Sequence, residues 1–128
     1  MAKKAVLLLN LGSPDSTSVD DVREYLKEFL LDERVIDSPP LVRNLVVRGF
    51  ILPTRPKESA EAYASVWTDE GSPLIVMSER QQKLLAEKQD LPIYLAMRYG
   101  SPSIPDEVAK MVKDGVEELL IVPLYPHY

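Results

Sequence analysis

The sequence predicts an α/β domain in which a small parallel sheet is flanked by helices. Three short runs, residues 5–9, 93–97 and 119–122, are apolar without alternation of polar and apolar positions. This pattern is typical of strands that are buried on both faces. A helical pattern separates the second run from the third. A strand, helix and strand in that order indicate parallel pairing with a right-handed crossover.

Four helices are expected between the first two strands. Ser18 is a candidate N-cap for the first, and acidic residues follow it in the first turn, where negative charge suits the helix dipole. The second is expected over the apolar segment 41–52, which ends at Pro53. The third is expected over 57–66, and Pro73 is suited to the first turn of a fourth.

The C-terminal part is expected to form a regular strand, helix and strand. Ser103 and Asp106 resemble a capping pair before this helix, and Gly115 is suited to end it. Ligands of open parallel sheets bind beyond the carboxyl ends of the strands, although the residues found there also serve simply to turn the chain. The three exit loops are residues 10–14, 98–102 and 123–128.

The composition of the 128 residues excludes several kinds of site. With 15 basic and 20 acidic residues, the formal net charge is -5, which does not favour general binding to nucleic acid. The absence of cysteine excludes disulfides, thiolate metal sites and cysteine nucleophiles, and it fits a reducing cytoplasm. No phosphate loop, GxGxxG or HExxH motif is present, and no apolar run has the length of a membrane span.

Four blocks of sequence resemble ferrochelatases, and they occur in the order found in that family. Together they cover essentially the whole chain, and the ordered set is more specific than any single block. The blocks are residues 7–14, then 55–57 with 60–63, 67 and 70–74, then 96–100 with 102–104, and last 124–128.

The resemblance implies a Rossmann-like, three-layer domain of the class II chelatase type. Residues 1–128 correspond to the first of two similar domains and are expected to be incomplete at the C-terminus. The whole enzyme would be a lyase of haem biosynthesis that inserts Fe²⁺ into protoporphyrin IX or a related porphyrin. Iron is then a substrate, and no cofactor is required. The family's catalytic histidine and its acidic partner lie in the second domain, so we expect this chain alone to be inactive.

The resemblance also implies which residues bind porphyrin. Leu11 is expected to pack against the macrocycle, with a core position at the strand end as the equal alternative. Arg55 is a candidate partner of a propionate, because guanidinium matches carboxylate in a two-pronged geometry. Tyr63 and Ser72 match positions that contact the macrocycle or its carboxylates, and helix packing and helix capping are compatible roles. His127 is a candidate metal ligand, but a single histidine without neighbouring ligands favours a structural or cleft-lining role.

The remaining expectations concern partners. The segment 41–52 matches one lip of the porphyrin cleft, and its apolar surface is a candidate contact for porphyrin or for a membrane. An ordinary packed helix is the alternative that the residues favour. The chain is thus expected in the cytoplasm, with peripheral membrane contact if 41–52 binds lipid.

We also expect the last strand to leave apolar surface uncovered, through which the chain would self-associate. Two other functions stay open. One is a stand-alone tetrapyrrole-binding module without activity, and the other is a small chelatase in which two half-sized chains pair.

Overall fold

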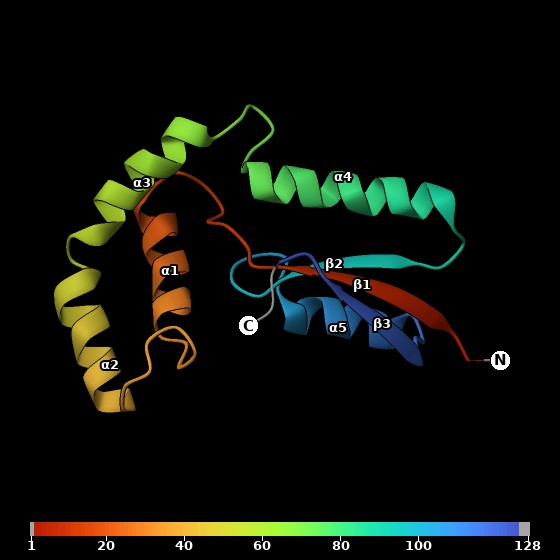
Figure 1. Ribbon diagram of the computed structural model, residues 1–128, viewed down its shortest axis with the longest axis horizontal. Coiled ribbons are helices and arrows are strands. Elements are labelled where there is room, and N and C mark those ends of the chain that lie inside the picture. Colours follow the sequence, from red (N-terminus) through yellow and green to blue (C-terminus); the bar gives the residue numbers. More distant parts are fainter. Residues whose placement is uncertain (1, 126–128) are drawn as a thin grey trace. The chain divides into compact units, whose positions relative to one another are not determined.

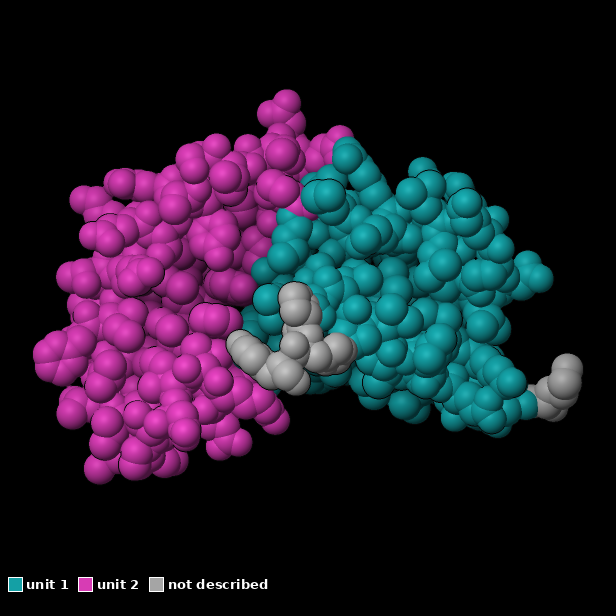
Figure 2. Space-filling model, in the orientation of Figure 1, with its two compact units in different colours: residues 1–12, 74–128 teal, residues 13–73 magenta. Residues whose placement is uncertain are grey.

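The computed structural model describes residues 2–125 and divides the chain into two compact units. Residues 1–12 and 74–128 form one unit, which contains the sheet, and residues 13–73 form the other, which is helical (Figure 2). We call them the sheet unit and the helical unit. Each is described by itself.

The sheet unit is built on three parallel strands in the order β2-β1-β3. They are β1 (Lys4–Asn10), β2 (Ile93–Met97) and β3 (Glu118–Pro123). The central strand is β1, in which Leu8 is the register partner of both Leu95 and Val122. The predicted strands and their parallel pairing are therefore confirmed.

Helices cover both faces of this sheet, which explains the lack of polar alternation in β1. Val6 and Leu8 belong to the core beneath α4 (Pro73–Lys88), whereas Leu7 belongs to the core beneath α5 (Ile104–Lys113). Figure 1 shows α4 and α5 on opposite faces of the sheet. A strand with two buried faces needs apolar side chains at successive positions.

The predicted caps of α5 are also confirmed. The Ser103 hydroxyl accepts a hydrogen bond from the main-chain N–H of Asp106 at 3.2 Å, and Gly115 follows the helix with a φ of +79°. The hydroxyl of Tyr94 donates to the carboxylate of Asp114 at 2.6 Å. This hydrogen bond is the main reason that the pKa of Tyr94 is raised to about 12.

Four helical segments make up the helical unit. Ser18 caps the first, because its hydroxyl accepts from the N–H of Asp21 at 3.1 Å. The last begins two residues earlier than expected, because Pro56 fits the first turn of a helix, where its missing N–H is not needed. The segments are α1 (Val19–Leu30), α2 (Pro40–Val46), the π-helix η1 (Val47–Ile51) and α3 (Arg55–Val66).

The predicted helix over 41–52 divides into α2 and η1 and packs through one face only. Val47 is fully buried, and the guanidinium of Arg43 donates to the carbonyl of Ser38 at 2.9 Å. The expectation of an ordinary packed helix therefore holds for that face alone. The opposite, outer apolar face consists of Leu41, Leu45 and Phe50, whose exposed fractions are 83%, 64% and 73%.

No helix among residues 2–125 is long and apolar enough to cross a membrane.

The edge strand β3 leaves apolar surface uncovered, as the sequence predicts. Leu120 and Ile121 point to opposite faces of the sheet, and they are 63% and 53% exposed. Within the described residues, β3 pairs with β1 alone. A parallel strand of this composition is ordinarily covered on both faces.

The exit loops of β1 and β2 approach each other closely at Gly12. The N–H of Tyr99 donates to the carbonyl of Leu11 at 2.8 Å, and Gly12 has a φ of +114°. A Cβ atom on Gly12 would lie 1.8 Å from the carbonyl oxygen of Tyr99. Only glycine fits this position without moving the main chain of the neighbouring loop.

We therefore predict that Gly12→Ala lowers the free energy of unfolding by roughly 3–5 kcal/mol, since it adds overpacking to backbone strain. Gly115→Ala is the matched control in the same unit, because its φ is also positive but its Cβ meets nothing within 4 Å. That variant should lose only about 1–2 kcal/mol. Urea unfolding followed by circular dichroism measures both losses, and equal losses would contradict the close approach.

Candidate functional site

The exit loops of the three strands meet at one edge of the sheet unit. The N–H of Arg98 donates to the carbonyl of Asn10 at 2.8 Å, and that of Leu124 donates to the carbonyl of Leu9 at 2.7 Å. These bonds continue the two parallel ladders beyond the strands. The described parts of the loops in the sheet unit thus gather where a ligand of an open parallel sheet would bind.

Leu11 lies at this edge with its main chain held on both sides. Its N–H donates to the side-chain oxygen of Asn10 at 2.8 Å, and its carbonyl accepts from Tyr99. The side chain of Leu11 is 38% exposed. Leu11 is therefore not among the buried core residues, and its contact with porphyrin stays a prediction. Beside Leu11, the guanidinium of Arg98 lies 4.9 Å from the ring centre of Tyr99.

The helical unit carries a cluster of aromatic side chains between α1 and α3. The ring of Tyr63 meets the rings of Tyr25 and Trp67 edge-on, with centroid distances of 6.4 and 6.5 Å. Phe29 stacks on Tyr25 at 6.4 Å. Edge-on and offset contacts are the favourable arrangements of aromatic rings, so the cluster fixes the orientation of Tyr63.

A hollow of about 220 Å³ opens on the surface of α3 beside this cluster. Mostly apolar groups line it, and burial raises the pKa of Tyr63 above its ordinary value. An apolar hollow with few polar groups suits an apolar part of a ligand. Its lining residues are Ser59, Ala62, Tyr63 and Val66.

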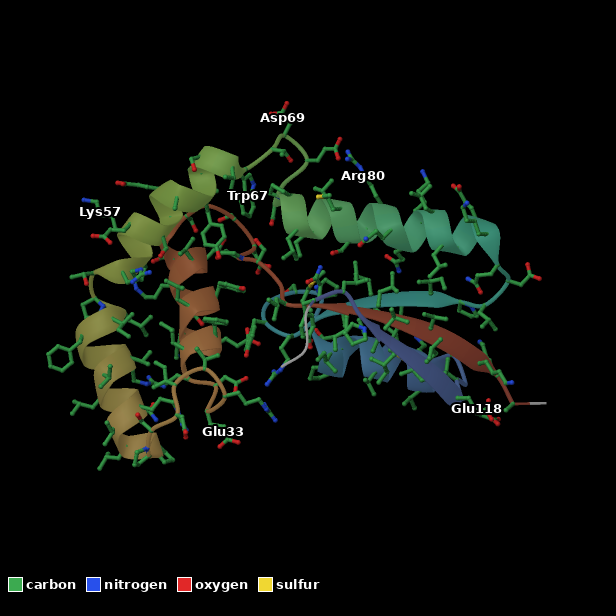
Figure 3. The ribbon with its side chains drawn as sticks, in the orientation of Figure 1. Glu33, Lys57, Trp67, Asp69, Arg80 and Glu118 are labelled. Atoms are coloured by element: carbon green, nitrogen blue, oxygen red, sulfur yellow. The ribbon has the colours of Figure 1, made fainter. Side chains whose placement is uncertain are left out.

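Arg55 begins α3 on the face that carries the hollow. It is exposed, and it precedes Ala62 by seven residues and Val66 by eleven, which are spacings that repeat on one side of a helix. The helical rise places Arg55 about 12 Å from Tyr63 along the axis. Figure 3 shows Lys57 near the beginning of this helix and Trp67 just after its end. A cation thus stands at one end of an apolar surface.

The other predicted site residues lie elsewhere. Leu11 belongs to the sheet unit, whereas Arg55 and Tyr63 share α3 of the helical unit. Ser72 is buried and directly precedes Pro73, the first residue of α4. His127 lies outside the described residues. Within residues 2–125, no group of three or more His, Asp or Glu side chains is placed to hold a metal ion.

Sequence reasoning missed Ser78, which contacts the exit loop of β1. This serine is only 1% exposed, and the side-chain amide of Asn10 donates to its hydroxyl at 3.1 Å. A signal was available, since Ser78 lies four residues after Leu74 and seven before Leu85, both of which pack in the core beneath α4. A polar residue within an apolar helical face needs a hydrogen-bond partner.

Comparison with known proteins agrees with this architecture. The family model described as ferrochelatase matches residues 3–128. A ferrochelatase from Opitutus terrae is 57% identical over the whole of this chain, and the match covers 38% of that relative. One from Pseudomonas fluorescens is 53% identical, with the same coverage of both chains. One from Yersinia enterocolitica is 49% identical over 99% of this chain and 40% of its own length.

The chain spans about two fifths of the length of these curated relatives. The family match extends through both units, including the strands, the exit loops and α3. On this match, the chain belongs to the ferrochelatase family.

Proposed function

We propose that this chain contributes a porphyrin-binding wall to an enzyme that inserts ferrous iron into a porphyrin in haem biosynthesis. The observation that carries the proposal is the surface of α3, where Arg55 stands at one end of the hollow beside Tyr63. The reaction is taken from relatives named ferrochelatase. Because the chain spans only part of their length, the activity is proposed for a whole protein of that kind.

A porphyrin offers two kinds of surface to such a wall. Its planar macrocycle is apolar, and each unit by itself offers it an apolar contact: the hollow on α3 in the helical unit, and Leu11 in the sheet unit. Its propionates are anionic, and they suit the guanidinium of Arg55 and the neutral hydroxyl of Tyr63, which can donate a hydrogen bond. Ser72 is proposed as a further contact, while its burial favours a structural role before α4.

Metallation requires the porphyrin to lose two pyrrole protons as iron enters. A general base near the ring and distortion of the macrocycle both lower the barrier to this step. We assign binding and orientation to the described side chains of this chain, and we expect the base elsewhere in the enzyme. Iron is a substrate in this scheme, and no resident cofactor is proposed.

Trp67 provides a direct test, because it is the only tryptophan in the sequence and lies edge-on to Tyr63. We predict that titration with a dicarboxylate porphyrin quenches its fluorescence. Arg55→Ala should raise the Kd about three- to tenfold, since a charge-assisted hydrogen bond is lost. Fluorescence titration of both proteins measures this ratio.

Lys57→Ala is the matched control, because it removes a positive charge from the same end of α3. It should change the Kd by less than about twofold, as expected for a screened surface charge. Equal losses in the two variants would indicate general charge attraction and contradict the anchoring role of Arg55. No binding by the unsubstituted chain would contradict the wall itself.

We further propose that the outer apolar face of α2 and η1 rests on a lipid surface. Leu45 follows Leu41 by one α-helical turn. In η1 the N–H of Leu52 bonds to the carbonyl of Val47, five residues earlier, so the π geometry brings Phe50 about one turn after Leu45. The three exposed side chains therefore form one row, which suits insertion between lipid headgroups.

The matching prediction uses a triple variant, Leu41→Ser, Leu45→Ser and Phe50→Ser. Co-sedimentation with vesicles of phosphatidylcholine and phosphatidylglycerol should fall at least about tenfold, since each side chain gives up apolar burial. The control is Met77→Ser with Leu84→Ser, two exposed apolar residues of α4. Unchanged sedimentation of the triple variant would overturn the lipid contact.

The exposed edge of β3 supports a second copy of this chain as a partner. Its outer edge offers unpaired main-chain groups, and Leu120 and Ile121 offer apolar surface on both faces. Pairing with the β3 strand of a second copy would supply hydrogen bonds to these main-chain groups and would cover the apolar side chains.

We predict that the 128-residue chain forms dimers or larger species in sedimentation equilibrium. Ile121→Lys should shift it toward monomer, because a charged side chain on an edge strand opposes strand addition. Val112→Lys is the control, since it places the same charge on an exposed position of α5 outside the edge strand. A chain that stays monomeric at every concentration would refute the pairing.

A further inference from the structure

We infer that Ser78 is a positioning residue for the porphyrin-facing loop after β1. The inference rests on the proposed function, because it assigns a residue that sets the place of Leu11, the proposed porphyrin contact of the sheet unit. Three side-chain hydrogen bonds carry it, and all of them lie within the sheet unit.

The three hydrogen bonds form a connected series with a defined donor-to-acceptor direction. The hydroxyl of Ser78 donates to the carbonyl of Leu74 at 2.7 Å, and its oxygen accepts from the side-chain NH₂ of Asn10 at 3.1 Å. The other end of that amide, its oxygen, accepts from the N–H of Leu11 at 2.8 Å. The series of hydrogen bonds thus links the backbone of α4 to the backbone of the exit loop.

This direction follows from the donor and acceptor capacity of each group. A hydroxyl has one hydrogen, and Ser78 uses it on Leu74, so its oxygen is left to accept. Asn10 must therefore turn its NH₂ toward Ser78, and this turns its oxygen toward Leu11. Removing the hydroxyl frees the amide to rotate, and the N–H of Leu11 loses its fixed acceptor.

Helix formation alone does not account for this serine. Alanine has the higher helix propensity, and a serine that bonds back to the carbonyl four residues earlier slightly disfavours the helix. The site is 1% exposed, so the hydroxyl makes its bonds inside the protein. What the hydroxyl adds over a methyl group at this position is the bond to Asn10.

The consequence reaches the ligand through the main chain. The carbonyl of Asn10 accepts from Arg98 and that of Leu11 accepts from Tyr99, so the loop is already held against β2 on one side. The amide of Asn10 adds the restraint on the N–H of Leu11. Together they fix the main chain of Leu11, a residue that is 38% exposed, in the place from which its side chain would pack against a macrocycle.

The experiment is a double-mutant cycle on the full chain with a dicarboxylate porphyrin as the probe. Ser78→Ala alone should raise the Kd about three- to tenfold and change the Soret absorption of the bound porphyrin. Leu11→Ala should also weaken binding. In the Leu11→Ala background, Ser78→Ala should have no further effect on the Kd, because the side chain that it positions is gone.

Two further measurements keep the outcome decisive. Ser16→Ala is the control, since the hydroxyl of Ser16 also donates a short hydrogen bond, to the carboxylate of Asp21 at 2.6 Å, and Ser16 is not one of the proposed porphyrin contacts. Asn10→Ala interrupts the series of hydrogen bonds at a half-buried position, where truncation leaves no core cavity, and it should reproduce the effect of Ser78→Ala. Hydrogen exchange of the Leu11 amide should speed up in both variants.

The possible failures are distinguishable. If porphyrin does not quench the Trp67 fluorescence of the unsubstituted chain, the proposed function fails and the inference fails with it. If it binds, but Ser78→Ala and Asn10→Ala bind equally well, the porphyrin site stands and the positioning role is refuted. Additive losses in the cycle would likewise assign Ser78 to stability alone and overturn the inference.

Discussion

The central position of β1 is the constraint on which the sheet unit depends. This strand is paired on both edges and buried on both faces in its middle, where Val6, Leu7 and Leu8 each have a register partner in β2 and in β3 and pack beneath a helix. The exit loop of β1 therefore begins at a fixed position, and at Gly12 it lies against the main chain of the β2 exit loop. An edge strand would leave the loop free on one side, whereas a central strand presents Asn10 and Leu11 from a rigid base.

The sequence predicts most of this framework, because the signals are local. Strands buried on two faces have continuous apolar runs, and the caps at Ser18 and Ser103 depend on residues three positions away. The partner of Ser78 could not be predicted in the same way. It depends on which side chains the fold brings together, since Asn10 meets a residue 68 positions later.

The segment 41–52 illustrates a different limit. Its apolar residues predict a helix correctly, but periodicity alone does not tell which face is covered. The π turn at η1 changes the relation between Leu45 and Phe50, and hydrophobic patterns read with an α-helical period miss that change. Arg43 in the same segment is buried, and its guanidinium donates to the carbonyl of Ser38 in the preceding loop.

The outer apolar face of α2 and η1 and the outer edge of β3 differ in what they require of a partner. The outer apolar face of α2 and η1 belongs to helices, whose interior main-chain groups are paired within the helix, so a partner there needs to offer only apolar contact. The outer edge of β3 carries main-chain donors and acceptors as well as Leu120 and Ile121, and lipid or a flat ligand would leave those groups unpaired. An extended polypeptide strand can pair with the main-chain donors and acceptors of such an edge. The chemistry of the main chain therefore supports the proposed lipid contact for the helical face and the proposed second copy of this chain for the strand edge.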